Sequence, residues 1–336
     1  MRPVALLRRL LLLVVVLLGV SLVVFSMMHL TPGDPVELML SQAGHVTDEE
    51  VQALRHEYGL DSPLHRQYCR FVGGAVRGDL GLSYKHKKPV AQVIATHLPA
   101  TVELTVCALV LALLVAIPVG VASALRHGSG LDWAAIGGSL IGVSMPGFWL
   151  GIVLMLVFAI GLEILPISGR IDHALVFQPR TGLYVLDGLI AGDPVALGSA
   201  LRHLLLPAVT LGAPMAAITA RMVRRSMIEA LQQDYVLFAR AKGLPESVVV
   251  IKHALRNALI PTITVVALQT GLLLSGNMII ETVFSWPGVG RLAVQGIEAR
   301  DYPLVQGVVL LYATTYVMLN LLADLLYGWA NPRIEE

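Results

Sequence analysis

Six polar residues lie inside or at the edge of long apolar stretches. A carboxylate or amide in such a stretch usually faces a neighbouring helix or a cavity that admits a polar solute. These six residues are therefore candidates for contact with a polar solute. Two other interpretations stay open: two of the residues lie near stretch ends and could reach lipid headgroups, and two lie four residues apart and could bond a neighbouring helix. Glu103 and Glu281 are the two near stretch ends, and Asn320 and Asp324 are the two that lie four residues apart. Gln269 and Asn277 are the remaining two of the six.

The sequence carries none of the familiar patterns for metal or nucleotide chemistry. Its ten histidines form no H-E-x-x-H pair, and it contains no G-x-x-x-x-G-K-[ST] loop. Cys69 and Cys107 are too far apart in predicted depth to form an obvious pair. We therefore expect no catalytic residue, no metal site, no bound cofactor and no nucleic-acid partner for this chain.

The composition indicates a membrane protein. Only 14% of the 336 residues are charged and the mean hydropathy is +0.73, whereas soluble domains carry about 25% charged residues. Six apolar stretches contain only Glu103 and Asp324 of the 24 basic and 23 acidic residues. All but the fourth reach the ~20 residues that cross a bilayer as a helix, and the fourth carries two prolines. The predicted spans are Leu10–Leu30, Val102–Ala124, Ala134–Gly161, Leu204–Ala220, Leu259–Ile280 and Leu304–Ala330.

Basic residues indicate the orientation. With the segment 31–101 set aside as too long for the positive-inside rule, twelve basic residues lie on the side of the N-terminus and five on the other. Both termini are therefore predicted to be cytoplasmic. The first span could instead be a cleaved signal peptide, but its length and the absence of a small-x-small cleavage site favour an anchor.

The outer segment 31–101 has soluble character. Thr47 and Glu50 form a capping box that predicts a short helix through Tyr58, and a second amphipathic helix is expected from Pro63 to Arg77. This segment is either a cap lying on its own membrane domain or a docking surface for a soluble partner.

The cytoplasmic stretch after the fourth span predicts a compact knob. The spacing of Met227, Leu231, Tyr235 and Phe238 predicts a helix from Arg224 to Lys242 that ends at Gly243. A turn follows, and a second helix begins at Ser247. The alternatives are an amphipathic connector on the membrane surface and a rigid element that fits a groove in a cytoplasmic partner. The small residues Ala239, Ala241 and Gly243 would allow another backbone to come close.

This stretch resembles the coupling loop of ABC importer permeases of the dipeptide, oligopeptide and nickel family. Residues 234–244 read D-Y-V-L-F-A-R-A-K-G-L, and residues 253–261 read H-A-L-R-N-A-L-I-P. Such permeases generally carry E-A-A-x-x-x-G, of which this chain keeps Ala239 and Gly243 but has Leu237 and Phe238 at the first two positions. These departures match the peptide branch's own variant. The resemblance extends along nearly the whole chain, through P-G-D-P at 32–35, G-D-L-G at 78–81, F-S-W-P-G-V-G at 284–290 and R-D-Y-P at 300–303. Within the family, the chain is most similar to the first (B-type) dipeptide permease subunits.

The resemblance implies an all-α polytopic membrane protein with six transmembrane helices and the type I ABC importer permease fold. Its parts would be the N-terminus and first span (1–30), a helical periplasmic segment (31–101) and a permease core (102–336) with the coupling loop at 224–258. The protein would import dipeptides or short peptides across the bacterial inner membrane. It would bind no ATP itself, since ATP and Mg²⁺ would be bound by two cytoplasmic ATPase subunits.

The implied partners are those ATPase subunits, a homologous second permease, a periplasmic or lipid-anchored peptide-binding protein and the lipid bilayer. The residues implied to contact the ATPase are Asp234, Tyr235, Phe238, Ala239, Arg240, Ala241, Lys242, Gly243 and Leu244. Ala239 and Gly243 would give close approach, while Arg240 and Lys242 would anchor the loop through polar contacts.

Other functions stay open at this point. Nickel and oligopeptide importers of the same family share these motifs. A proton-driven transporter acting alone would be expected to show an internal repeat with paired broken helices, and a membrane enzyme would need ionisable residues clustered at one depth. Neither pattern is evident in the sequence.

Overall fold

The computed structural model describes residues 3–30, 36, 48–57, 59–274 and 277–330. Apart from an isolated β-bridge between Leu82 and Pro89, the regular structure in these residues is helical. Five helices are long and apolar enough to cross a membrane, and a sixth span arises if one bent pair of helices is counted as a single crossing. The number agrees with the six spans predicted, although the helix in the fifth, Leu259–Ile280, ends at Leu274. The chain is an all-α polytopic membrane protein.

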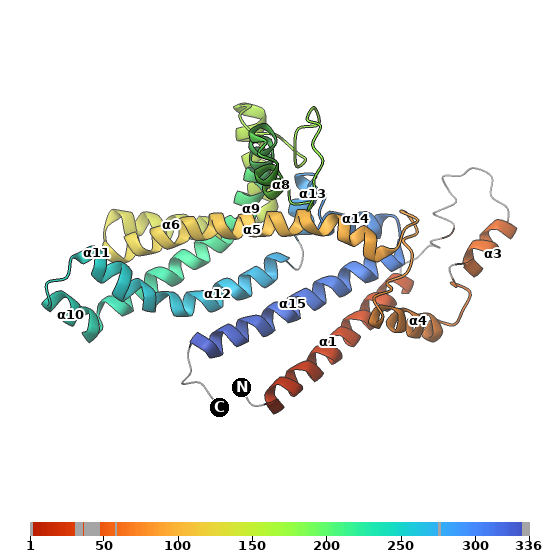
Figure 1. Ribbon diagram of the computed structural model, residues 1–336, viewed down its shortest axis with the longest axis horizontal. Helices are drawn as coiled ribbons and strands as arrows, with labels where there is room; N and C mark the ends of the chain where they lie inside the picture. The colour runs from red at the N-terminus through yellow and green to blue at the C-terminus, as the bar shows by residue number, and fades with distance from the viewer. Residues whose placement is uncertain (1–2, 31–35, 37–47, 58, 275–276, 331–336) are drawn as a thin grey trace. The chain divides into compact units, whose positions relative to one another are not determined.

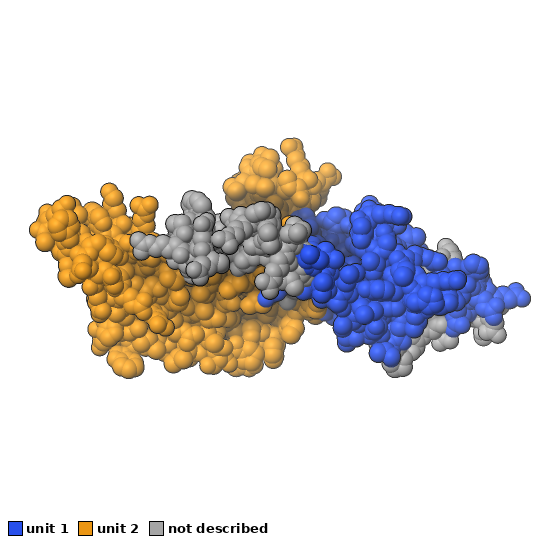
Figure 2. Space-filling model, turned by 90° about the horizontal axis from the view of Figure 1, so that it is seen from below, with its two compact units in different colours: residues 1–101, 287–317 blue, residues 102–286, 318–336 orange. Residues whose placement is uncertain are grey.

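The helices fall into two compact units, coloured separately in Figure 2. Residues 1–101 and 287–317 form unit 1, and residues 102–286 and 318–336 form unit 2. These units reflect packing within the chain, so the division at residues 30 and 101, which follows the membrane sides, stays a prediction.

Unit 1 contains the N-terminal helix and the outer segment. Its helices are α1 (Pro3–Leu30), α3 (Asp48–Glu57), α4 (Leu64–Val76), the first part of α5 (Val90–Leu125), α14 (Val289–Glu298) and the first part of α15 (Tyr302–Ala330). The helix predicted for Pro63–Arg77 is confirmed as α4, and its Tyr68 hydroxyl is 2.9 Å from the Ser21 hydroxyl of α1. Thr47 and Tyr58, which bounded the other predicted helix, lie outside the described residues.

Unit 2 contains the remaining helices, most of which carry a label in Figure 1. The order after α5 is α6 (Gly130–Ser144), α7 (Gly147–Leu154), the π-helix η1 (Met155–Gly161), α8 (Tyr184–Ala191), α9 (Pro194–Leu231), α10 (Asp234–Ala241), α11 (Glu246–Val248), the π-helix η2 (Val249–Leu255), α12 (Arg256–Leu274) and α13 (Met278–Val283).

The third predicted span is not one straight helix. The chain bends by 105° between α6 and α7, at Met145 and Pro146. Proline has no N–H for the helical ladder and disfavours helical geometry in the residue before it, and Met145 is accordingly extended, with φ −83° and ψ 127°. The uninterrupted span predicted for 134–161 is therefore corrected to a broken one.

The fourth span, marginal by sequence, is part of the longest helix. α9 runs from Pro194 to Leu231 and passes through Pro207 and Pro214 without ending. Helices α9 and α5 come close at two glycines, where a larger residue would clash. A Cβ added to Gly212 would lie 2.7 Å from the Ala108 carbonyl oxygen, and a Cβ added to Gly120 would lie 2.7 Å from the Ala220 carbonyl oxygen. Close backbone contact at these two points thus holds α9 against α5.

Candidate coupling surface and transmembrane polar sites

The knob predicted at residues 224–258 is built on the end of α9. The structure contradicts the single helix predicted from Arg224 to Lys242: α9 ends at Leu231, and α10 begins at Asp234 after a turn at Gln232 and Gln233. This break changes which residues point inward. Val236 is completely buried, whereas Tyr235 and Phe238, which continued the apolar spacing of α9, are exposed.

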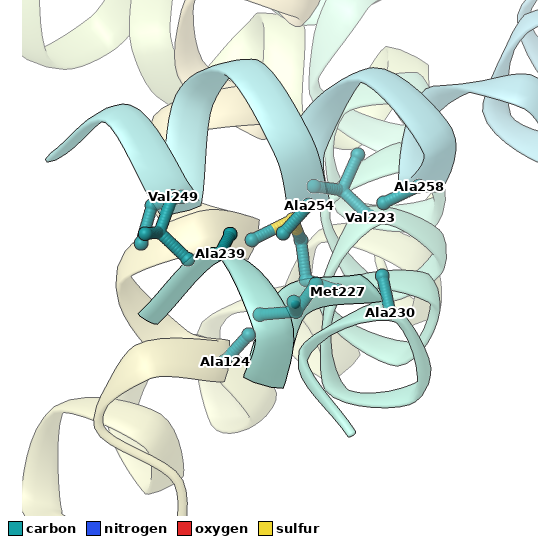
Figure 3. Close-up of a cluster of buried hydrophobic side chains, with 10 residues drawn as sticks. Ala124, Val223, Met227, Ala230, Ala239, Val249, Ala254 and Ala258 are labelled. Carbon is teal, nitrogen blue, oxygen red and sulfur yellow. The ribbon is translucent and has the colours of Figure 1, made fainter. Parts of the chain in front are cut away.

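Small residues bring the knob's elements together. Figure 3 shows α10 packed against α9 and η2 through the side chain of Ala239, with Ala124 of α5 close by. Only 4% of Ala239 is exposed, so it belongs to this chain's own core. The interpretation of Ala239 as a surface residue that lets another backbone approach is therefore wrong. The cluster consists of Ala124, Val223, Met227, Ala230, Val236, Ala239, Val249, Val250, Ala254 and Ala258.

An ion pair braces the same region between α6 and α9. The Arg224 guanidinium donates from Nε to Asp132 Oδ1 at 2.6 Å and from Nη2 to Oδ2 at 2.8 Å. The Asp132 carboxylate also accepts from the Ser123 hydroxyl and, at 2.9 Å, from the Gly128 N–H. A bidentate pair of this kind fixes orientation as well as distance, so the ends of α5, α6 and α9 are held together beneath the knob.

A glycine turn closes the knob, as predicted. Gly243 has φ +75°, its N–H donates to the Arg240 carbonyl oxygen at 2.9 Å, and the Leu244 N–H donates to that of Ala239 at 3.4 Å. A left-handed residue after the helix is the usual place for glycine. A Cβ added to Gly243 would meet nothing within 4 Å, so the outer side of the turn is open.

Large apolar side chains are exposed on α10 and directly after the Gly243 turn. We call Tyr235, Leu237, Phe238 and Leu244 the coupling surface; each is exposed, and Phe238 is the most exposed at 61%. Asp234 and Ala241 are also exposed. Large exposed apolar residues gathered on α10 and the turn after it are typical of a contact with a protein or with a membrane.

The two predicted basic anchors are partly engaged within the chain. Arg240 Nη2 donates to Glu246 Oε1 at 2.6 Å, and both side chains are exposed. The Lys242 ammonium lies 4.4 Å from the centre of the Phe238 ring. A partner protein that binds here would therefore contact the Arg240–Glu246 ion pair and the Phe238 ring, which the Lys242 ammonium already contacts.

Glu103, one of the six predicted pathway residues, is bound by groups of its own chain. Its carboxylate accepts from Arg170 Nη2 and, at 2.7 Å, from the Val185 N–H. Arg170 also donates to the Gly182 carbonyl oxygen at 2.8 Å, and its guanidinium lies 3.9 Å from the centre of the Tyr184 ring. Both charged side chains are buried, so this pair holds the segment 162–183 against α5.

That segment has a second buried anchor which the sequence analysis missed. The Asp187 carboxylate accepts from the Thr181 hydroxyl at 2.8 Å and from the N–H groups of Arg180, Thr181 and Gly182 at 3.0 Å. Burial opposes ionisation, but these hydrogen bonds outweigh it and hold the pKa of Asp187 below its usual range. No sequence signal marked Arg170 or Asp187, because the spacing of a loop does not reveal which carboxylate or N–H groups it will meet.

The other five pathway candidates do not all lie at one site. Gln269 and Asn277 line the same pocket, about 270 Å³ in volume. Glu281 is completely buried in α13 and lies outside the lining of that pocket. The Asn320 side-chain oxygen Oδ1, on α15, is buried without a hydrogen bond in the part of the chain that the structure describes, and the Asp324 side chain lies outside the described residues.

Comparison with known proteins assigns the family. The chain matches the family described as "Binding-protein-dependent transport system inner membrane component" over residues 116–336, and the N-terminal family of the same membrane components over residues 4–105. It is 44% identical to the dipeptide transport system permease protein DppB of Escherichia coli, over 98% of each chain. It is 44% identical to the di/tripeptide transport system permease protein DppB of Pseudomonas aeruginosa, again over 98% of each, and 41% identical to the glutathione transport system permease protein GsiC of Pectobacterium atrosepticum, over 97% of each. The chain therefore belongs to the inner membrane permease components of binding-protein-dependent transport systems.

Proposed function

We propose that this chain is a permease subunit of an ATP-driven importer for dipeptides or short peptides, and that it forms the translocation pathway with a homologous second permease. The observation that carries the coupling role is the exposed coupling surface on a knob whose base is buried and braced by Asp132 and Arg224. The substrate class is supported by the relatives, two of which are permeases for dipeptide and di/tripeptide transport.

The remaining partners follow from this assignment. Two cytoplasmic ATPase subunits would bind ATP and Mg²⁺ and contact the knob, and a periplasmic or lipid-anchored peptide-binding protein would deliver the cargo on the opposite side. Both termini of the chain would be cytoplasmic. A rigid knob suits this arrangement because movement of the ATPase subunits is passed to α9 and α12 only if the connection does not bend.

The function is tested by ATP-dependent uptake. The full complex in proteoliposomes, with its binding protein present, is expected to import radiolabelled alanyl-alanine only when ATP is on the ATPase side. Trialanine, glutathione and Ni²⁺ tested in parallel separate the related cargo classes. Uptake that continues without ATP, or a purified chain that carries no ATPase subunit, would contradict the proposal.

The coupling surface makes a separate prediction. Phe238→Ala removes the most exposed ring of the proposed contact, and truncation of a residue that dominates an interface costs about 2 kcal/mol or more. The Kd of the permease for the ATPase subunits is therefore expected to rise about thirtyfold, with the chain itself still folded. Ile251→Ala is the matched control, since Ile251 of η2 is 64% exposed but lies outside the coupling surface. Equal losses from both variants would argue against a specific contact at Phe238.

A further inference from the structure

The pocket shared by Gln269 and Asn277 lies where three membrane helices are interrupted or carry a proline. α7 begins at its edge with Gly147, directly after the 105° bend at Pro146. Pro214 of α9 is part of the lining, and α12 ends at Leu274 shortly before α13 begins at Met278. Transport proteins commonly place solute-binding sites at discontinuous helices, because irregular backbone within a membrane is tolerated where it lines a cavity.

Three polar side chains in the pocket have hydrogen-bonding capacity left over among the residues that the structure describes. Asn277 Nδ2 donates to the Leu273 carbonyl oxygen at 2.6 Å, and its side-chain oxygen has no hydrogen bond to a described residue. Thr210 donates its hydroxyl to the Leu206 carbonyl oxygen at 2.8 Å and can still accept. Gln269 makes no side-chain hydrogen bond within residues 3–30, 36, 48–57, 59–274 and 277–330. A polar side chain within a membrane span normally faces a neighbouring helix or a polar cavity, so Gln269, which lines this pocket, indicates a polar occupant.

The chemical groups in the lining indicate which kind of molecule the pocket would bind. Among the described residues, the polar part of the lining consists of two amide residues and one hydroxyl residue, and the rest is apolar, including Leu272 and Ile280. A carboxamide carries donors and an acceptor together, which matches the N–H and C=O of a peptide group without any charge. The described lining residues include no imidazole, thiolate or carboxylate, the ligands that Ni²⁺ would use.

We propose that this pocket is a transient binding station for the neutral peptide group of the cargo, with Gln269 as its principal contact and Asn277 and Thr210 as acceptors. This inference rests on the proposed function. One or two neutral hydrogen bonds bind weakly, and weak binding suits a site that a substrate must leave again during transport. Apolar neighbours such as Leu272 would accept cargo side chains with little selectivity.

The first test removes the principal contact. Gln269→Leu keeps the approximate size of the side chain and loses both hydrogen-bonding groups. In proteoliposomes containing the full complex, its maximal rate of alanyl-alanine uptake is expected to fall about tenfold, the effect of one lost buried hydrogen bond. ATP hydrolysis stimulated by the binding protein is expected to stay at the wild-type rate, and Gln269→Asn is expected to recover part of the uptake. Leu268→Ala is the control, since Leu268 is 46% exposed and lies outside the pocket.

The second test is independent of folding defects in the first. In a background without Cys69 and Cys107, Gln269→Cys is expected to react with a charged, membrane-impermeant thiol reagent, and this reaction is expected to block uptake. Leu268→Cys is expected to stay unreacted. Equal reaction at both positions would overturn the proposal, as would wild-type uptake by Gln269→Leu.

These outcomes are separable from those of the proposed function. If the wild-type complex imports no peptide, the function itself fails, whatever the variants do. If the wild type imports alanyl-alanine and Gln269→Leu imports it equally well, only the binding station fails. A parallel loss of uptake and of stimulated ATP hydrolysis in Gln269→Leu would also overturn it, since the residue would then act in coupling.

Discussion

Gly243→Asp is expected to abolish ATP-dependent peptide uptake while leaving the chain folded and inserted. Gly243 has φ +75°, and a side chain at this position would meet nothing within 4 Å of its Cβ. The substitution should therefore cost the fold only about 1 kcal/mol of backbone strain. The new carboxylate would project from the open side of the turn next to Phe238 and Leu244, where burial of an unpaired charge against a partner is strongly unfavourable.

Uptake of alanyl-alanine and co-purification of the ATPase subunits measure this effect. Gly243→Asn is the matched control, because asparagine has nearly the same shape, tolerates positive φ and carries no charge. We expect Gly243→Asn to retain more uptake than Gly243→Asp. Normal uptake by Gly243→Asp would contradict the coupling role of this turn.

Arg170→Leu is expected to destabilise the chain by about 3–5 kcal/mol, because it leaves a buried carboxylate without its partner. The Arg170 and Glu103 side chains are only 8% and 7% exposed, and together they hold the segment 162–183 against α5. Glu103→Leu alone is expected to cause a loss of similar size. The double variant is expected to be much closer to the wild type, since it buries no unpaired charge.

Reversible unfolding in detergent, followed for all four forms of this double-mutant cycle, gives the interaction free energy directly. The pair Arg225–Glu229 provides a control of the same chemistry, with a distance of 3.1 Å but with side chains 79% and 63% exposed. Its disruption is expected to change stability by about 0.5 kcal/mol or less. If additivity held between Arg170→Leu and Glu103→Leu, the buried pair would not be the unit that holds this segment.

The sequence alone determined the membrane character and the approximate spans. Residues excluded from bulk water cannot carry many charges, so the six apolar stretches were evident from composition along the chain. Gly243 was also identified correctly as the end of the knob's helix, since glycine after an amphipathic helix is a local signal that needs no distant partner.

Tertiary structure decided which face of the knob is exposed. The apolar spacing from Met227 to Phe238 predicted a continuous helix, but burial of Val236 and Ala239 is achieved only when the chain turns at Gln232 and Gln233. Local periodicity cannot anticipate this, because the helix register after a break depends on the surface against which it packs. The coupling surface therefore became visible only in three dimensions.

The same reason explains the polar sites. Glu103 and Gln269 looked alike in sequence, as single polar residues in apolar stretches. Glu103 proved to be paired with Arg170, which is 67 positions away, whereas Gln269 faces a pocket with Asn277. Hydropathy records that a polar group lies in a membrane span, but only the packing of helices distant in sequence determines whether that group meets a buried partner or an open cavity.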